Sequence, residues 1–255
     1  MSSLPHRLNR TVLIEAPRTV VFDFFLEQER WASWWGAGST IEPRPGGRAY
    51  IRYPGGVEAA GEVVEVKAPE RLVFTYGFVS GNPIGPGESR VTITLEAVGG
   101  DTRLHLLHEF DNEKVRDEHV QGWRFQLSLF ANAVADSLHA GAAQRVDQWF
   151  TAWADPDAQG RLAALSSIAA PDVVFRDRFS LVSGIDDLSA HITAAQRFMP
   201  GMRLTRNGDI RHCQGMVLAN WDAVDPGGAV KGSGTNVFTM NADRRIASAT
   251  GFWRN

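Results

Sequence analysis

Residues 112–141 read NEKVRDEHVQGWRFQLSLFANAVADSLHAG and form the longest helical pattern of the 255-residue chain. Their apolar side chains recur every three or four positions and share one helix face, namely Val115, Val120, Trp123, Leu127, Phe130, Val134 and Leu138. The helix should begin near Asn112, and Gly141 is suited to be its C-cap. The stretch therefore predicts a long amphipathic helix that closes one folded unit at about residue 140.

The sequence upstream of this helix has mainly the alternating pattern of strands. A strand is predicted over residues 8–15, and two short helices follow around residues 17–25 and 27–34. Turns rich in glycine and proline then separate most of the strands predicted at 48–53, 61–67, 71–78, 90–97 and 102–110. This order of elements predicts a curved antiparallel sheet wrapped around the long final helix.

The sequence downstream of Gly141 has a different order of elements. Helical patterns cover residues 146–153, 159–168 and 186–198, and a short strand at 172–177 lies between the second and third. Four strands are then predicted at 202–212, 216–224, 230–240 and 246–253. Three helices and a bent antiparallel sheet predict a cone with an open mouth.

The two parts also differ in acidic residues. Thirteen glutamates lie in residues 1–140, whereas residues 141–255 contain 11 aspartates and no glutamate. A chain of this length suits two domains. We therefore expect two α+β domains, residues 1–140 and residues 141–255.

The overall composition argues against several classes of protein. A net charge of −3 gives no electrostatic reason to expect nucleic acid or an anionic membrane as a partner. The single cysteine, Cys213, cannot form an internal disulfide, which indicates a reducing compartment. Residues 1–19 lack the apolar stretch of a signal peptide, and no run approaches the ~20 apolar residues of a membrane span. A cytoplasmic location is expected.

Three of the eight tryptophans lie within the stretch WASWWGAGST, residues 31–40. Trp31 and Trp35 are four positions apart on a predicted helix, so the cluster can belong to the core. Alternatively, Trp34 or Trp35 walls a pocket for a flat apolar ligand. A third interpretation is an exposed patch for a protein partner. The sequence leaves these three alternatives open.

The strand at 102–110 carries two histidines. His105 and His108 are three positions apart, so their side chains point to opposite faces and cannot share a metal ion. His108 alternates with the apolar residues expected inside, and is either a polar group in a pocket or a structural histidine. Trp123 should form the floor of the same cavity, and Tyr50 is a possible polar anchor for a ligand.

Asp177 is the strongest candidate for a catalytic residue in residues 141–255. Alternation along residues 173–177 places its side chain on the same face as Phe175. Partial desolvation beside Phe175 would raise the pKa of the carboxyl toward that of a useful base. The alternatives are an aspartate that caps a loop, or an ion pair with Arg176 or Arg178. His191 is the next titratable candidate.

Other site types are not predicted. His212 and Cys213 are adjacent in a predicted strand, and no zinc-ligand spacing occurs in the sequence. The glycine-rich segments 81–87 and 232–234 lack the strand-to-helix context of a phosphate loop. We therefore expect no metal and no cofactor.

Several motifs of the first part resemble the START-like (SRPBCC) superfamily, in the branch of the activator of heat-shock protein 90 ATPase. They are Trp34-Trp35, Pro45-Gly46-Gly47-Arg48, Arg71-Leu72-Val73-Phe74-Thr75, Thr102-Arg103-Leu104, His108 and Gly122-Trp123. The resemblance covers about residues 8–138. It implies a helix-grip fold with a cavity between the sheet and the long helix, and it implies no common chemistry.

The second part, over residues 143–254, resembles the SnoaL-like superfamily related to nuclear transport factor 2. The motifs are the helix 146–153, the run APDVVFRD at 170–177, Gly184 before a helix, Arg245-Ile246 and Gly251-Phe252-Trp253. Within the ketosteroid isomerase pattern, Asp177 falls at the general base and Asn236 near the oxyanion site. The tyrosine donor of that pattern has no counterpart, because residues 141–255 contain no tyrosine. The family also implies a possible homodimer through residues 200–255.

These observations together predict a protein that binds a hydrophobic, polyketide- or steroid-like small molecule. Catalysis would be cofactor-free proton abstraction next to a carbonyl, with Asp177 as base and Asn236 as oxyanion donor. The expected apolar walls of that site are Trp149, Trp153, Phe175, Trp221 and Trp253. The alternatives are a non-catalytic carrier or sensor, and a chaperone-associated interaction module.

Overall fold

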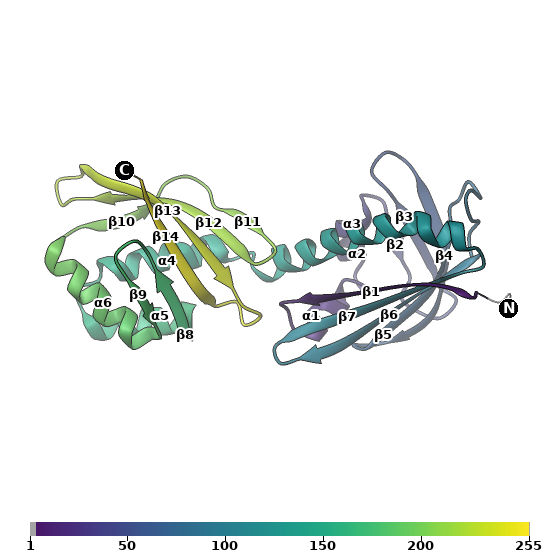
Figure 1. Ribbon diagram of the computed structural model, residues 1–255, viewed down its shortest axis with the longest axis horizontal. Coiled ribbons are helices and arrows are strands. Elements are labelled where there is room, and N and C mark those ends of the chain that lie inside the picture. The colour runs from purple at the N-terminus through teal and green to yellow at the C-terminus, as the bar shows by residue number, and fades with distance from the viewer. Residues whose placement is uncertain (1–3, 255) are drawn as a thin grey trace. The chain divides into compact units, whose positions relative to one another are not determined.

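The computed structural model describes residues 4–254, so residues 1–3 and 255, at the ends of the two expected domains, lie outside the described part. The chain divides into two compact units that meet between Ala135 and Asp136 (Figure 1). That residues 1–140 and residues 141–255 are separate domains that fold independently stays a prediction. None of the helices within residues 4–254 is both long and apolar enough to cross a membrane.

The first unit is built on a seven-stranded sheet in which every neighbouring pair is antiparallel. The spatial order is β1-β7-β6-β5-β4-β3-β2. The strands are β1 (His6–Ile14), β2 (Thr40–Ile41), β3 (Arg48–Arg52), β4 (Glu58–Lys67), β5 (Arg71–Tyr76), β6 (Ser89–Val98) and β7 (Asp101–Phe110). The meander predicted from the turn signals is therefore present, with the short β2 in addition.

The helices α1 (Arg18–Asp23) and α2 (Gln28–Trp35) and most of α3 (Glu113–Leu138) complete the first unit. The last three residues of α3 belong to the second unit. Asn112 caps α3, because its Oδ1 accepts hydrogen bonds from the backbone N of Lys114 at 2.9 Å and of Val115 at 3.2 Å. The apolar stripe of α3 is buried as predicted except at Val120, which is half-buried, and Phe130 stacks on Phe25 with ring centroids 5.2 Å apart.

The tryptophan cluster of α2 lies in the interior of the first unit. Trp31, Trp34 and Trp35 are all at most 2% exposed, and the Trp34 ring contacts Phe130 of α3 at a centroid distance of 4.8 Å. The prediction that His108 faces inward with its apolar neighbours is also confirmed, since His108 is fully buried whereas His105 is exposed. The cluster is therefore part of the core, and the third interpretation, an exposed patch, is wrong.

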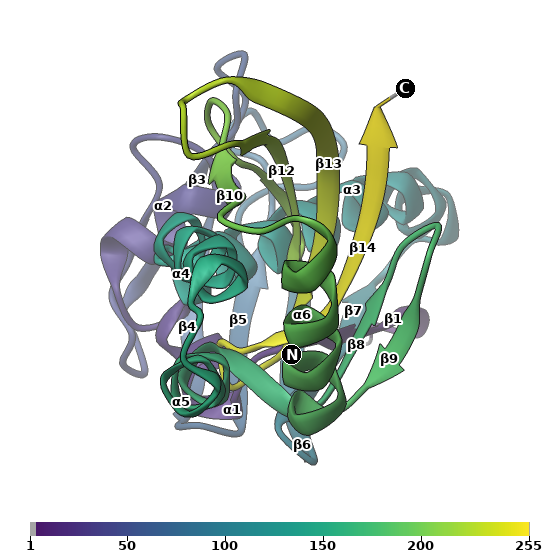
Figure 2. The same ribbon diagram turned by 90° about the vertical axis from the view of Figure 1, so that its left-hand side faces the viewer.

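The second unit contains the helices α4 (Ala142–Ala154), α5 (Ala158–Ile168) and α6 (Ile185–Phe198). Its strands are β8 (Ala169–Arg176), β9 (Leu181–Ser183), β10 (Arg203–Arg206), β11 (Arg211–Cys213), β12 (Met216–Val224), β13 (Val230–Met240) and β14 (Ile246–Arg254). The sheet has the order β10-β12-β13-β14-β8-β9, with β11 paired to β12. Figure 2 shows the three helices in front of this sheet.

Three details of the second unit differ from the predictions. The β8–β14 pair is parallel, so the sheet is mixed. The strand expected at 202–212 is divided into β10 and β11, because the chain turns at Gly208, which has φ of +80°. Gly141 is the N-cap of α4 and not the C-cap of the preceding helix, and its φ of −88° is not left-handed.

Candidate functional site

Strand register brings three positions of the second sheet together on its helix-facing side. Phe175 of β8 pairs with Ala249 of β14, which in turn pairs with Phe238 of β13. These side chains are buried and pack beneath α4, where Trp149 contacts both phenylalanine rings. Because side chains two residues apart share a face, the next row contains Asp177, Gly251 and Asn236.

Gly251 keeps space open between the two polar side chains. Asn236 pairs directly with Gly251. A Cβ added at Gly251 would lie 3.2 Å from the Asn236 Oδ1 atom and 3.4 Å from the Asp177 Cβ atom. Asp177 and Asn236 therefore flank a position without a side chain.

The Asp177 carboxylate is held by hydrogen bonds from its own turn and from β14. Its Oδ1 accepts from the backbone N of Phe179 at 2.9 Å and from the Ser180 hydroxyl at 2.7 Å. Its Oδ2 accepts from Trp253 Nε1 at 3.2 Å. The loop-capping role is thus performed by Oδ1, and Oδ2 is the oxygen on the side of the tryptophan.

His191 of α6 reaches Asp177 through Ser180. The Ser180 Oγ atom lies 3.3 Å from His191 Nε2. Because the single hydroxyl proton of Ser180 is donated to Asp177 Oδ1, Ser180 must accept at Oγ, and His191 must donate from Nε2. His191 therefore orients Ser180 and is absent from the cavity lining given below.

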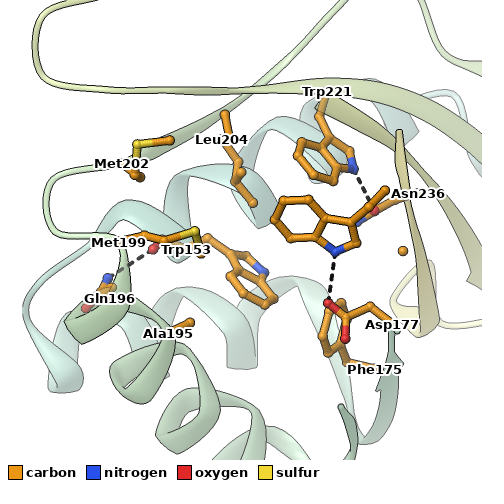
Figure 3. Close-up of a pocket in the computed structure, with 13 residues that line it drawn as sticks. Trp153, Phe175, Asp177, Ala195, Gln196, Met199, Met202, Leu204, Trp221 and Asn236 are labelled. Atoms are coloured by element: carbon orange, nitrogen blue, oxygen red, sulfur yellow. Dashed lines mark hydrogen bonds between the residues drawn. The ribbon is translucent and has the colours of Figure 1, made fainter. Parts of the chain in front are cut away.

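The amide of Asn236 is held through its oxygen. Its Oδ1 accepts from Trp221 Nε1 at 2.8 Å (Figure 3). An indole nitrogen can only donate, so this contact fixes which end of the amide is the oxygen. The Nδ2 group is consequently directed away from Trp221, and no acceptor for it is present among residues 4–254.

The cavity around these residues has a volume of about 60 Å³. It is lined by Trp153, Phe175, Asp177, Ala195, Gln196, Met199, Met202, Leu204, Trp221, Ala223, Asn236, Gly251 and Trp253. The Trp221 and Trp253 rings meet edge to face with centroids 5.0 Å apart. A drug-sized ligand fills roughly 300–1,000 Å³, so a larger ligand requires the flexible Met199 and Met202 side chains to move.

A second cavity, of about 620 Å³, lies in the first unit. It is lined by Trp35, Tyr53, Pro54, Val57, Tyr76, Phe78, Pro83, Glu118, His119, Gly122, Trp123, Phe125, Gln126 and Leu129. Trp35 and Trp123, both predicted to contact a ligand, line it and contact each other at a centroid distance of 5.7 Å. Trp34 and His108 are not among its lining residues.

The nitrogen atoms of His108 are both engaged inside the protein. Trp123 Nε1 donates to His108 Nδ1 at 2.8 Å, and His108 Nε2 lies 2.8 Å from the Ser89 hydroxyl. Ser89 donates its proton to the backbone oxygen of Tyr76, so His108 must donate from Nε2 and is neutral. Burial holds the pKa of His108 well below its ordinary value. This arrangement is that of a structural histidine.

Two further residues that were predicted to contact a ligand, Tyr50 and Trp149, line neither cavity. The Tyr50 hydroxyl hydrogen-bonds Glu58 Oε1 at 2.5 Å, and Tyr50 lines neither cavity. Trp149 is fully buried beneath the second sheet and is likewise absent from the lining. Their roles in ligand binding receive no support from this placement.

Several residues of these sites were not predicted from the sequence. Ser180 follows Asp177 in an Asp-x-x-Ser turn, which is a recognisable signal of side-chain capping. Gly251 was noted only as a family landmark. Tyr53, Tyr76 and His119 line the cavity of the first unit, but no local pattern indicated that they lie together.

Residues 4–254 contain no cluster of three or more His, Cys, Asp or Glu side chains that could hold a metal ion.

Comparisons with known proteins were made for both parts of the chain. Residues 15–135 match the family described as Activator of Hsp90 ATPase homolog 1-like protein. Residues 146–249 match the SnoaL-like domain family. No match was found among curated proteins.

Solved structures similar to the chain each cover about half of it. A candidate isomerase of the SnoaL-like family from Agrobacterium tumefaciens is 23% identical, with 47% of this chain and 99% of that chain covered and a TM-score of 0.43. Protein Ms6760 from Mycobacterium smegmatis is 22% identical, with 55% and 98% covered and a TM-score of 0.45. CalU16 from Micromonospora echinospora is 21% identical, with 52% and 78% covered and a TM-score of 0.43.

The two family matches follow one another along the chain without overlap. Each falls on one of the two mixed α/β units described above. The chain is a tandem of an Activator of Hsp90 ATPase homolog 1-like domain and a SnoaL-like domain.

Proposed function

We propose that the SnoaL-like domain catalyses cofactor-free proton transfer on an apolar, polyketide- or steroid-like carbonyl compound, as a cyclase, isomerase or dehydratase would. The observation that carries this proposal is the pair formed by Asp177 and Asn236 on either side of Gly251. One side chain can accept a proton and the other can donate a hydrogen bond, within a cavity walled by Trp153, Trp221 and Trp253.

In the proposed step, Asp177 Oδ2 removes a proton from the carbon next to the substrate carbonyl. The electron pair of the broken C–H bond forms a C=C bond, and the C=O π electrons move to the oxygen. Asn236 Nδ2 donates a hydrogen bond to this developing enolate oxygen. The proton then returns from Asp177 to the product, so no cofactor takes part in the cycle.

The surroundings of the two residues support these roles. Ser180, Phe179 and Trp253 hold the carboxylate in place through their three hydrogen bonds. Trp221 engages Asn236 Oδ1, which leaves Nδ2 as the donor that the proposal assigns to the enolate. Because no tyrosine is present in residues 141–255, the oxyanion site has one donor fewer than the isomerase pattern. The loss of one such donor costs roughly 3 kcal/mol of transition-state stabilisation, so slow turnover is expected.

The test is exchange of the C1 protons of 2-tetralone with solvent deuterium, followed by NMR. The protein should accelerate the exchange, and Asp177→Asn should abolish the acceleration. Asp172→Asn is the matched control, because Asp172 is an exposed aspartate on β8, the strand that ends just before Asp177. Equal acceleration by wild type and Asp177→Asn would contradict the proposed role of Asp177.

A second function, non-catalytic binding of a small molecule by the N-terminal domain, is favoured by cavity size. The cavity of that domain has about 620 Å³, against about 60 Å³ in the SnoaL-like domain. The volume of about 620 Å³ lies within the usual range for a drug-sized ligand. We take this domain to be a helix-grip fold and the SnoaL-like domain to be a cone. Binding of naphthalene, measured by calorimetry, tests this second function.

A further inference from the structure

Two tyrosine hydroxyls in the N-terminal cavity have unused hydrogen-bonding capacity. The oxygens of Tyr53 and Tyr76 lie 2.9 Å apart and both residues line the cavity. Two hydroxyls carry two protons, but the bond between them uses only one. The second proton has no acceptor among residues 4–254 and is available to a ligand.

Both phenols keep their protons at neutral pH. Burial raises the pKa of Tyr53 to about 12, and burial together with the neighbouring Tyr53 raises the pKa of Tyr76 well above its ordinary value. The pair therefore acts as a hydrogen-bond donor and not as a base. Such a donor recognises an oxygen acceptor on a ligand.

His119 supplies the complementary acceptor. Its Nδ1 lies 2.7 Å from the backbone oxygen of Val115 and must therefore carry a proton. Burial lowers the pKa of His119, so the ring is neutral and Nε2 carries a lone pair. This Nε2 atom is buried without any partner among the described residues. The His119 and Tyr76 rings meet edge to face with centroids 5.9 Å apart, so acceptor and donors serve one ligand.

The remaining lining determines the shape and charge of that ligand. Trp35, Trp123 and Phe78 provide aromatic surface, which suits flat ring systems. The only charged side chain among the described lining residues is the exposed Glu118. A negatively charged ligand would therefore meet a carboxylate and no described lysine or arginine of the lining, which disfavours it.

We propose that this cavity binds a neutral, flat polycyclic molecule that bears an oxygen acceptor for the Tyr53–Tyr76 pair and a hydroxyl donor for His119 Nε2. This specificity rests on the second function proposed above, binding of an apolar small molecule in the same cavity. The aromatic walls contribute affinity, and the three polar side chains select neutral ketones and phenols.

Four probes with one ring system test the proposal by calorimetry on the full chain. Naphthalene has no polar group, 2-acetylnaphthalene adds an acceptor, 2-naphthol adds a hydroxyl, and 2-naphthoate adds a charge. We expect the ketone and the phenol to bind about three- to tenfold more tightly than naphthalene, as one net hydrogen bond allows. The carboxylate should bind more weakly than naphthalene.

Substitutions test which side chains cause these binding preferences. The double variant Tyr53→Phe/Tyr76→Phe should remove the preference for 2-acetylnaphthalene while naphthalene binds as before. Because both partners of the buried hydrogen bond are replaced by residues of the same shape, stability should be nearly unchanged. Tyr50→Phe is the matched control, since it deletes the one other tyrosine hydroxyl of the chain, outside the cavity. His119→Leu should remove only the preference for 2-naphthol.

The outcomes separate this inference from the proposal on which it rests. If naphthalene itself does not bind, the cavity is not a site for apolar molecules and both proposals fail. If naphthalene binds but all four probes bind equally, or if the double variant retains its preference for the ketone, the proposed polar recognition is overturned and apolar binding stands.

Discussion

The indole Nε1 of Trp123 on α3 donates a 2.8 Å hydrogen bond to the imidazole Nδ1 of His108 on β7. This bond joins the helix to the sheet next to the N-terminal cavity, which Trp123 also lines. A proton added at Nδ1 of His108 would replace the acceptor with a second donor and break the bond. The contact therefore couples the packing of α3 to the protonation state of one buried histidine.

The free energy of unfolding should fall as the pH is lowered from 7.5 to 5. Burial depresses the pKa of His108 in the folded state, so below about pH 6.5 the unfolded chain binds a proton that the folded chain does not. His108 alone should contribute a loss of about 2 kcal/mol at pH 5. Urea unfolding of wild type and His108→Gln at both pH values measures this contribution.

The His108→Gln variant should show a smaller loss on acidification than wild type. His105→Gln is the control, because His105 is exposed on the same strand. If the unfolding free energy of His108→Gln fell on acidification by as much as that of wild type, His108 would not be the cause of the loss.

Trp34 and Trp35 should differ in ligand binding although both support the core. Trp34→Ala and Trp35→Ala should each lower the free energy of unfolding by about 3–5 kcal/mol. Only Trp35 lines the N-terminal cavity, so only Trp35→Ala should weaken naphthalene binding, by roughly tenfold for ~1–2 kcal/mol of lost ring contact. The measurement is calorimetry of naphthalene binding at a temperature where both variants are folded. If both variants bound naphthalene equally weakly, both rings would contact the ligand, against the prediction.

Gly251→Ala should impair turnover with little effect on stability. The new methyl group would occupy the space between Asp177 and Asn236, at 3.4 Å and 3.2 Å from the nearest atoms. The change in unfolding free energy should stay within about 1 kcal/mol, because the neighbours need to move only slightly. The measurement is exchange of 2-tetralone protons, as for Asp177→Asn.

Gly232→Ala provides the control for this substitution. It adds the same methyl group to the same sheet. Apart from residues 231 and 233, the nearest atom to this methyl group would be 3.6 Å away, on the Trp253 ring. Equal activity in both glycine variants would mean that the space beside Gly251 is not used.

The two expected domains should fold separately. Residues 1–140 contain all of α3, which ends at Leu138, and residues 141–255 begin at the N-cap of α4. No helix or strand is therefore cut by this boundary. Each fragment should unfold cooperatively in urea, monitored by circular dichroism. Two fragments that gain order only when mixed would indicate one intertwined domain.

The SnoaL-like domain should form a homodimer through residues 200–255. Phe252 on β14 is 57% exposed and pairs with Thr235 of β13, on the face opposite the Asp177 row. We expect this exposed aromatic side chain to lie in the dimer interface. Light scattering at tens of micromolar should report a dimer for wild type and a monomer for Phe252→Asp. A monomeric wild type would contradict the prediction.

The sequence by itself determined the elements and the faces of the candidate sites. Periodicity located α3 and its buried stripe, because a helix with one apolar face must bury that face. Alternation placed Asp177 beside Phe175 and His108 among apolar neighbours, because strand side chains point to opposite faces in turn. These relationships are local, so the residue order alone expresses them.

Only the tertiary structure decided which of these side chains meet. Asp177 and Asn236 are 59 positions apart and flank Gly251 because β8 pairs with β14 and β14 pairs with β13 in one register. Tyr53 and Tyr76, 23 positions apart, share a hydrogen bond in the lining of the N-terminal cavity. A shift of one residue in pairing moves every side chain of a strand to the other face. Such contacts depend on long-range pairing, which no local pattern in this sequence specifies.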